Sequence, residues 1–208
     1  VTSGARVVRD MFYDGHPKEE PGAVVCRVAQ SFTRFGSLQI FASRGEVDVL
    51  RQLVDYTIRT DFPHLGDPSP DVYVKWFEEV CRDTIHMIAE WMRGGFVHGV
   101  MNTDNMAISG ETIDYGPCAF MDTYAPGTVF SSIDVQGRYA YGNQSLILSW
   151  NLTRLAETLI PLVDPDKDRA IKLLTDTIEH IQPLYETHWL GGMRSKIGLS
   201  TEDPHDLE

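Results

Sequence analysis

The period of the apolar residues changes along the chain, from short pieces typical of strands to long stretches typical of helices. Residues 23–29 and 37–42 are short, apolar, β-branched or aromatic, and close to glycine, so each is predicted to be a strand. Residues 1–22 are predicted to form mainly turns, because glycine and proline interrupt their apolar pieces. The β structure is therefore expected early in the chain.

Helical spacing of apolar residues dominates the rest of the sequence. It predicts helices over 45–63, 71–93, 145–163 and 168–190, the last with a kink near Pro183 and followed by a short polar tail from Gly191. Residues 106–115 are expected to form a tight hairpin around Ser109-Gly110-Glu111, and residues 117–144 a loop. Strands followed by helices indicate an α+β fold.

Composition narrows the possible partners. The chain has 208 residues and a formal net charge of −12, and 42% of its residues are hydrophobic, enough for an ordinary packed core. An acidic surface repels phosphate backbones and anionic lipids, so neither a nucleic acid nor a membrane is expected as a partner. A local basic pocket for a nucleotide stays compatible with this charge. No apolar run reaches the roughly 18 residues of a membrane helix.

Cysteine usage and the start of the sequence add two expectations. Cys26, Cys81 and Cys118 are far apart and odd in number, which fits neither a disulfide framework nor a zinc pair and favours a reducing compartment. The sequence begins with Val1 and no signal-like region follows, so we expect a piece of a longer protein.

The strongest chemical signal is the stretch HGVMNTDNMAISGETIDYGP, residues 98–117. Kinases bind Mg²⁺ through an Asn at the end of the catalytic loop and through the Asp of an Asp-aromatic-Gly turn that follows a hairpin. His98 to Asn105 has the span of that loop, and Asp114 begins a matching Asp-Tyr-Gly turn. The hairpin would bring Asn105 and Asp114 together on one metal ion.

The stretch differs from a kinase loop at one position, and each of its motifs also has a simpler structural interpretation. Val100 occupies the position where a kinase carries its proton-accepting Asp, and Asp104 is the carboxylate left inside the loop. Asp-Tyr-Gly is often a simple turn, Asn105 could cap a strand, and His98 could be a hydrogen-bonded core histidine. The ordered combination favours the kinase-like site over these separate alternatives.

Seven longer stretches closely resemble one family. The chain is similar to the selenoprotein O (SelO) family of kinase-like proteins in HGVMNTDNM, TIDYGPCAFMD, GRYAYGNQ, WNLTRLAETL, EPGAVVCRVAQSFTRFGSLQ, RDMFYDG and GGMRSKIGL. The resemblance covers essentially the whole chain and implies a protein-kinase-like fold. Residues 1–66 would form the end of the small lobe and a connecting helix, and residues 67–208 most of the helical C-lobe with the catalytic loop and metal-binding hairpin.

The resemblance also implies an activity. SelO members are understood to bind ATP in an inverted orientation and to transfer AMP, rather than the γ-phosphate, to Ser, Thr or Tyr hydroxyls of target proteins. This implies ATP as substrate, Mg²⁺ or Mn²⁺ as cofactor, and proteins bearing such hydroxyls as partners. The compartment would be the cytoplasm for a bacterial member and the mitochondrion for a eukaryotic one.

Roles for individual residues follow from the same resemblance. Asp104 would accept the hydroxyl proton, which accounts for the missing carboxylate at position 100. Asn105 and Asp114 would hold the metal, with Asp114 also close to the nucleotide. Arg27 and Arg34 would contact the phosphates of the inverted nucleotide.

The arginines also have an interpretation from the residues alone. A guanidinium is permanently charged and planar, which suits phosphate oxygens. In the predicted apolar strand, Arg27 would be costly to bury unpaired. A structural ion pair with a carboxylate is the alternative for both Arg27 and Arg34.

The family's glycine-rich phosphate loop, its strand lysine and the glutamate paired with it would lie upstream of these residues. By itself this chain is therefore expected to have little or no activity. Two other functions stay open: an ordinary phosphotransferase, to which Val100 is an obstacle, and a catalytically inactive kinase-like scaffold, which would not need Asp104, Asn105 and Asp114.

Overall fold

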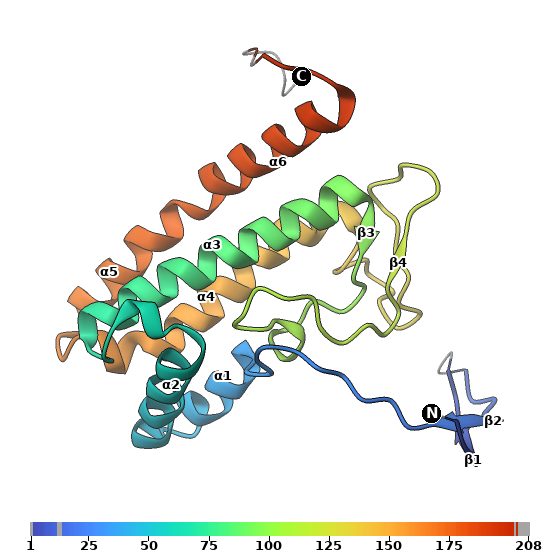
Figure 1. Ribbon diagram of the computed structural model, residues 1–208, viewed down its shortest axis with the longest axis horizontal. Coiled ribbons are helices and arrows are strands. Elements are labelled where there is room, and N and C mark those ends of the chain that lie inside the picture. The colour runs from blue at the N-terminus through green and yellow to red at the C-terminus, as the bar shows by residue number, and fades with distance from the viewer. Residues whose placement is uncertain (1, 12–13, 202, 204–208) are drawn as a thin grey trace.

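A computed structural model describes residues 2–11, 14–201 and 203. Long helices make up most of this part, and two small two-stranded sheets accompany them (Figure 1). The elements follow in the order β1 (Thr2–Arg9), β2 (Lys18–Ala23), α1 (Phe35–Ser43), α2 (Val47–Asp61), η1 (Pro63–Leu65), α3 (Pro70–Gly94), β3 (Phe96–Val97), η2 (Thr103–Asn105), β4 (Ala119–Phe120), η3 (Tyr141–Asn143), α4 (Gln144–Val163), α5 (Lys167–Glu179) and α6 (Ile181–Ile197).

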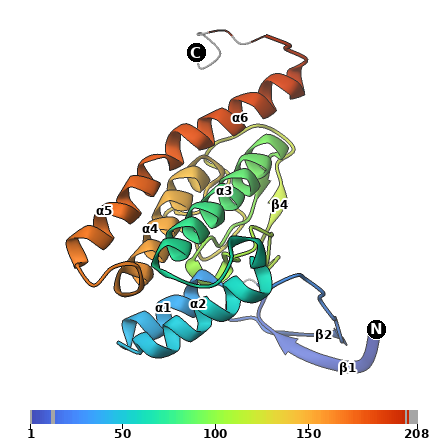
Figure 2. The same cartoon turned by 60° about the vertical axis from the view of Figure 1, so that its left-hand side comes forward.

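Helix α3 is the centre of the core. Ser69 caps its start by accepting from the Val72 N–H at 3.4 Å, and Gly95 ends it in the left-handed conformation, φ 73°. Its apolar residues cover more than one face, so α3 packs against α4 on one side and α6 on another (Figures 1 and 2). The largest fully buried side chains of this helix are Trp76, Phe77, Ile85 and Ile88.

The predicted helices over 45–63, 71–93 and 145–163 are confirmed as α2, α3 and α4. On α2, Leu50, Val54 and Ile58 are buried one turn apart, as their spacing predicts. Together with the two small sheets, these helices confirm the α+β class. The division at residue 66 into two lobes stays a prediction.

The C-terminal prediction is wrong in two respects. The helix breaks at His180 rather than kinking at Pro183, and α6 then continues through Gly191 to Ile197, where a tail was predicted. Packing against α3 stabilises this extension. A Cβ on Gly192 would come within 2.8 Å of the Arg93 Cδ, and the Lys196 ammonium donates to the Arg93 carbonyl at 2.6 Å.

The strand predictions near the N-terminus are also wrong. Residues 2–9 and 18–23 form an antiparallel pair instead of turns, which lies apart from the helices (Figure 1). Residues 24–29 have no regular structure, because no strand lies beside them within the described residues. Their valines are exposed, so the β-branched composition of this segment has no sheet to pack into.

Residues 37–42, predicted as a strand, belong to helix α1. Phe35 and Leu38 are fully buried and lie one helical turn apart, and Phe41 packs partly buried on the same core. This spacing of three was present in the sequence, and including Phe35 in the segment would have revealed it.

Among the described residues, one helix is long and apolar enough to span a membrane by length and composition alone. It covers Tyr141–Val163, and its best window has a mean hydropathy of 1.2. Of that window, 56% is buried inside the structure, and a core helix in the middle of a helical fold passes the same test.

We predict that Leu38 and Ile40 contribute very differently to stability. Leu38 is fully buried and Ile40 is 44% exposed on the same helix. Leu38→Ala should lower the free energy of unfolding by about 2–5 kcal/mol, and Ile40→Ala by less than about 1 kcal/mol. Urea denaturation measures both. Equal losses would contradict helix α1, because a strand would place both residues on one face.

Candidate active site

The end of α3 leads directly into the loop that carries the predicted chemistry. Gly95 stops the helix, and the short strand β3 pairs with β4 through Phe96–Phe120 and Val97–Ala119. His98 follows at once. The loop is thus anchored on one side by the longest helix of the structure and on the other by a small sheet.

His98 is a buried structural histidine. Its side chain is fully buried and stacks on Trp91, with ring centroids 5.3 Å apart. Nε2 donates to the Ile113 carbonyl at 2.7 Å, and Nδ1 accepts from the Val100 N–H at 3.3 Å. Both ring nitrogens are therefore occupied in the neutral form. Burial lowers the pKa of His98, although its hydrogen bond to Ile113 opposes this.

The hydrogen bond from His98 joins the loop to the far arm of the hairpin. Ile113 directly precedes Asp114, so the bond fixes the backbone just before the predicted metal ligand. The hairpin itself has a single antiparallel bridge, Met106–Thr112, around a turn in which Gly110 has φ 66°. The predicted hairpin is confirmed in this reduced form.

Asn105 is oriented for a ligand role by a second hydrogen bond. Its side-chain nitrogen donates to the Val100 carbonyl at 2.9 Å, and the residue is only 8% exposed. Because a carbonyl can only accept, the amide nitrogen must face Val100, which leaves the side-chain oxygen of Asn105 as its free acceptor.

Asp104, in contrast, is exposed and lies against the first turn of α1. A Cβ on Gly36 would overlap the Asp104 carboxylate and would lie 3.0 Å from its Cγ. Gly36 therefore makes room for this side chain. The sequence analysis missed this contact. A glycine two residues after Arg34, just inside a helix, was the available signal.

Asp114 has an unusual backbone. Its φ is 57°, and it is the non-glycine residue with positive φ among those that the structure describes. The Gly116 N–H donates to the Asp114 carbonyl at 2.7 Å and closes the turn. A left-handed Asp costs conformational energy, and such residues cluster at ligand sites. The side chain of Asp114 is exposed.

Arg34 is held beside the loop by backbone pairing. It forms an isolated antiparallel bridge with Ala107, flanked by hydrogen bonds from Phe35 N–H to the Met106 carbonyl (3.0 Å) and from Ile108 N–H to the Thr33 carbonyl (2.9 Å). The backbone of Arg34 is thus paired with Ala107, which lies two residues after Asn105.

Arg27 reaches the other arm of the hairpin. Its guanidinium donates to the Thr112 carbonyl at 2.6 Å and lies 5.5 Å from the ring centroid of Tyr115. The residue is exposed, so the argument that burial would be costly does not apply. Within the described residues, neither Arg27 nor Arg34 has a carboxylate oxygen within 4.0 Å, so the alternative of a structural ion pair is not observed.

Two buried side-chain amides of α4 hydrogen-bond to the backbone of the loop and of the strand before it, and the sequence analysis did not identify them. Gln144 accepts from the His98 N–H at 3.1 Å and donates to the Phe96 carbonyl at 2.9 Å. Asn151 donates to the Met101 carbonyl at 2.8 Å. Asn151, a polar residue on the apolar face of the predicted helix 145–163, was a sequence signal for this role, whereas Gln144 lay in the predicted loop and carried none.

A divalent metal fits the residues at this loop. Mg²⁺ and Mn²⁺ take hard oxygen ligands, and Mg²⁺ commonly uses one or two protein oxygens together with phosphates and water. The side-chain oxygen of Asn105 and the carboxylate of Asp114 are such donors. Within the described residues, no three His, Cys, Asp or Glu side chains gather to hold a metal, so the ion would depend on nucleotide oxygens as well.

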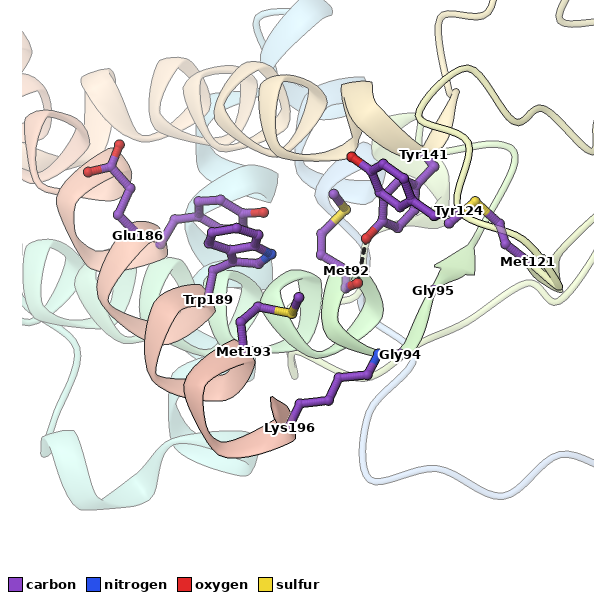
Figure 3. Close-up of a pocket in the computed structure, with 11 residues that line it drawn as sticks. Met92, Gly94, Gly95, Met121, Tyr124, Tyr141, Glu186, Trp189, Met193 and Lys196 are labelled. Atoms are coloured by element: carbon purple, nitrogen blue, oxygen red, sulfur yellow. Dashed lines mark hydrogen bonds between the residues drawn. The ribbon is translucent and has the colours of Figure 1, made fainter. Parts of the chain in front are cut away.

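A cavity also lies outside the loop and hairpin. It has about 550 Å³ and opens between the end of α3, the segment after β4 and α6 (Figure 3). Aromatic and methionine side chains line it, and the Tyr141 hydroxyl donates to the Met92 carbonyl at 2.6 Å. Burial raises the pKa of Tyr185 to about 12, so this phenol stays neutral. None of the five predicted site residues lines the cavity.

The loop, the hairpin and the two segments bound to their backbone carry two exposed carboxylates, an amide held by its nitrogen, and two arginines without carboxylate partners among the described residues. Such residue types occur in proteins that bind a nucleotide with a metal. The chain belongs to the SelO family. The family model described as "Protein adenylyltransferase SelO" matches residues 1–207.

Individual relatives agree with this membership. A protein of Bacillus cytotoxicus named "Protein nucleotidyltransferase YdiU" is 54% identical over 208 residues, which is 100% of this chain and 41% of the relative. Proteins of the same name from Cereibacter sphaeroides (53% identical over 90% of this chain and 39% of the relative) and Alkaliphilus metalliredigens (52% over 99% and 40%) are also similar. The chain spans about two fifths of the length of these relatives.

We predict that buried neutral His98 makes stability depend on pH. The unfolded chain takes up a proton near the ordinary histidine pKa of 6.5, whereas the folded state resists it, because burial of the imidazole disfavours its charged form and lowers the pKa of His98. Stability from this group is full above pH 6.5 and is lost as the pH falls below it, by at most about 1.4 kcal/mol per pH unit.

Urea denaturation at about pH 7.5 and about pH 5.5 tests this dependence. His98→Gln removes the titrating group and should show a smaller loss of stability between the two pH values than the unchanged chain. Equal losses would show that His98 is not held neutral.

Proposed function

We propose that the full-length protein that contains this chain is a protein adenylyltransferase with a protein-kinase-like fold. It would transfer AMP from ATP, bound in inverted orientation, to Ser, Thr or Tyr hydroxyls of target proteins. The observation that carries this proposal is the convergence of Arg27 and Arg34 on the loop and hairpin that hold Asp104, Asn105 and Asp114. The family's description as adenylyltransferase supports the same reaction.

Adenylyl transfer sets clear requirements. The hydroxyl oxygen attacks the α-phosphorus, the bond from that phosphorus to the bridging oxygen of the β-phosphate breaks, and pyrophosphate leaves with the electron pair. Negative charge grows on the phosphate oxygens during this step, so positioned cations lower the barrier. Arg27 and Arg34, free of carboxylates in the described part of the chain, would neutralise it.

The proton of the attacking hydroxyl needs an acceptor. Asp104 would take or orient it, because its carboxylate is exposed in the loop and fixed in place against Gly36. Val100 leaves no carboxylate at the usual kinase position, so this duty falls within the loop to Asp104.

Asn105 and Asp114 would hold the divalent metal, which when bound supplies positive charge to the phosphates of ATP. The protein's own contribution is orientation. The hydrogen bond from the Asn105 nitrogen to the Val100 carbonyl leaves the Asn105 oxygen as the free acceptor. The left-handed turn presents the Asp114 carboxylate to solvent. Both side chains are therefore ready for the ligand before it binds.

Labelled ATP tests the proposal. The full-length protein that contains this chain is incubated with Mg²⁺ or Mn²⁺ and with ATP labelled at either the α- or the γ-phosphate. Label from the α position should appear on protein, and Asp104→Asn and Asp114→Asn should each reduce it by about 10²-fold or more. Transfer of γ label would indicate an ordinary phosphotransferase, and no transfer of either label would indicate a scaffold.

Gly36 provides a second, finer prediction. Gly36→Ala puts a methyl group where the Asp104 carboxylate lies, so the carboxylate must shift and transfer should fall by about 10²-fold. Stability should change by less than about 1 kcal/mol, because alanine suits the helix. Gly191→Ala is the matched control, since that helical glycine has no atom within 4 Å of an added Cβ. Equal activity of both variants would contradict the Gly36–Asp104 contact.

A further inference from the structure

Two of the stretches that resemble the family, GRYAYGNQ and WNLTRLAETL, contain no residue of the proposed site. The structure brings them together on one ring. The guanidinium carbon of Arg138 lies 4.8 Å from the centroid of Trp150, and that of Arg154 lies 5.5 Å from the same centroid. Two permanent positive charges are thus held by one aromatic side chain. We call Arg138, Trp150 and Arg154 the arginine–tryptophan cluster.

The cluster is accessible and only partly neutralised. Arg138 is exposed, and within the described residues no carboxylate oxygen lies within 4.0 Å of its guanidinium. Trp150 is 40% exposed. Arg154 pairs with Glu157 at 2.6 Å through one terminal nitrogen, while its buried Nε has no hydrogen-bond partner. The surface therefore retains positive charge in a chain whose formal net charge is −12.

The position of Arg138 is built into its loop. The nearby carboxylate of Asp134 does not pair with the guanidinium. It accepts instead from the Arg138 and Tyr139 backbone N–H groups, both at 2.8 Å. The Asn143 side chain also ties the loop by donating to the Gly137 carbonyl at 2.8 Å. The Asp134 carboxylate thus fixes the backbone of the loop and leaves the charge of Arg138 for another partner.

The cluster is connected to the loop of the proposed active site through α4. Trp150 directly precedes Asn151, whose side chain donates to the Met101 carbonyl, and Met101 is three residues from Asp104. An extended peptide advances about 3.3 Å per residue, so a flanking segment of several residues would run along this path. A protein substrate bound at Asp104 would therefore reach the cluster with residues close to its acceptor hydroxyl.

We propose that the arginine–tryptophan cluster binds an acidic segment, rich in Asp or Glu, that flanks the acceptor hydroxyl of a protein substrate. This specificity rests on the transfer activity proposed above. Guanidinium groups bind carboxylates through paired N–H donors, and an exposed indole face packs on the neighbouring aliphatic part of the peptide. The formal net charge of −12 disfavours binding of such a segment elsewhere on the chain, so the cluster would select where it docks.

Peptide transfer kinetics test the docking role. One peptide with a single Thr acceptor and an acidic flank is compared with a second peptide in which the acids are replaced by Gln. The acidic peptide should have the lower KM, and Arg138→Gln with Arg154→Gln should raise that KM about three- to tenfold while kcat changes little. KM for the Gln-flanked peptide should not respond. Arg59→Gln is the matched control, because it removes one exposed arginine from α2, outside the cluster.

Binding without chemistry separates the two proposals. An acidic peptide with Val in place of the acceptor Thr is followed by fluorescence anisotropy, with and without the two substitutions. Weaker binding by the variant supports the cluster even if no label is transferred, a result that would overturn the proposed activity alone. Equal binding by both proteins, or a preference for anionic vesicles over the peptide, would overturn the acidic-segment docking.

Discussion

The proposed site depends on one hydrogen bond inside the core, from Nε2 of His98 to the carbonyl of Ile113. The imidazole lies at the end of α3 and β3, and the carbonyl lies in the far arm of the hairpin. A buried carbonyl left without a partner is costly, so this bond keeps the second arm folded back onto the loop. The bond thus joins the two segments that carry Asn105 and Asp114, the residues proposed to share a metal ion.

The remaining contacts extend this arrangement outward. Gln144 and Asn151 bind the backbone of the loop from α4, and the pairing of residues 33–35 with 106–108 brings Arg34 to its side. Each of these segments is far from the loop in sequence. The amides and the imidazole are buried, whereas Asp104, Asp114 and Arg27, proposed to act on a nucleotide, are exposed. A rigid support under exposed polar groups is the arrangement that positioning and charge stabilisation require.

Much of the helical structure could be predicted because it depends on local periodicity. Leu50, Val54 and Ile58 recur at helical spacing, and Ser69 and Gly95 mark the ends of α3 by their capping chemistry. The strand predictions failed because a β-branched segment becomes a strand only where another strand pairs with it, and residues 24–29 have no such neighbour in the described part of the chain. Segment boundaries mattered too. Without Phe35, the helical spacing of α1 could not be recognised.

The sequence by itself determined the family, the helical periods and the order of loop, hairpin and Asp-Tyr-Gly turn, because all of these depend on residues close together in the chain. Only the tertiary structure decided which residues meet. It placed the Asp104 carboxylate on Gly36, left Arg27 and Arg34 without carboxylate partners within the described residues, and set Arg138 and Arg154 on one indole ring. The Gly36–Asp104 contact joins segments tens of residues apart, and packing of the whole chain, rather than any local pattern, selects it.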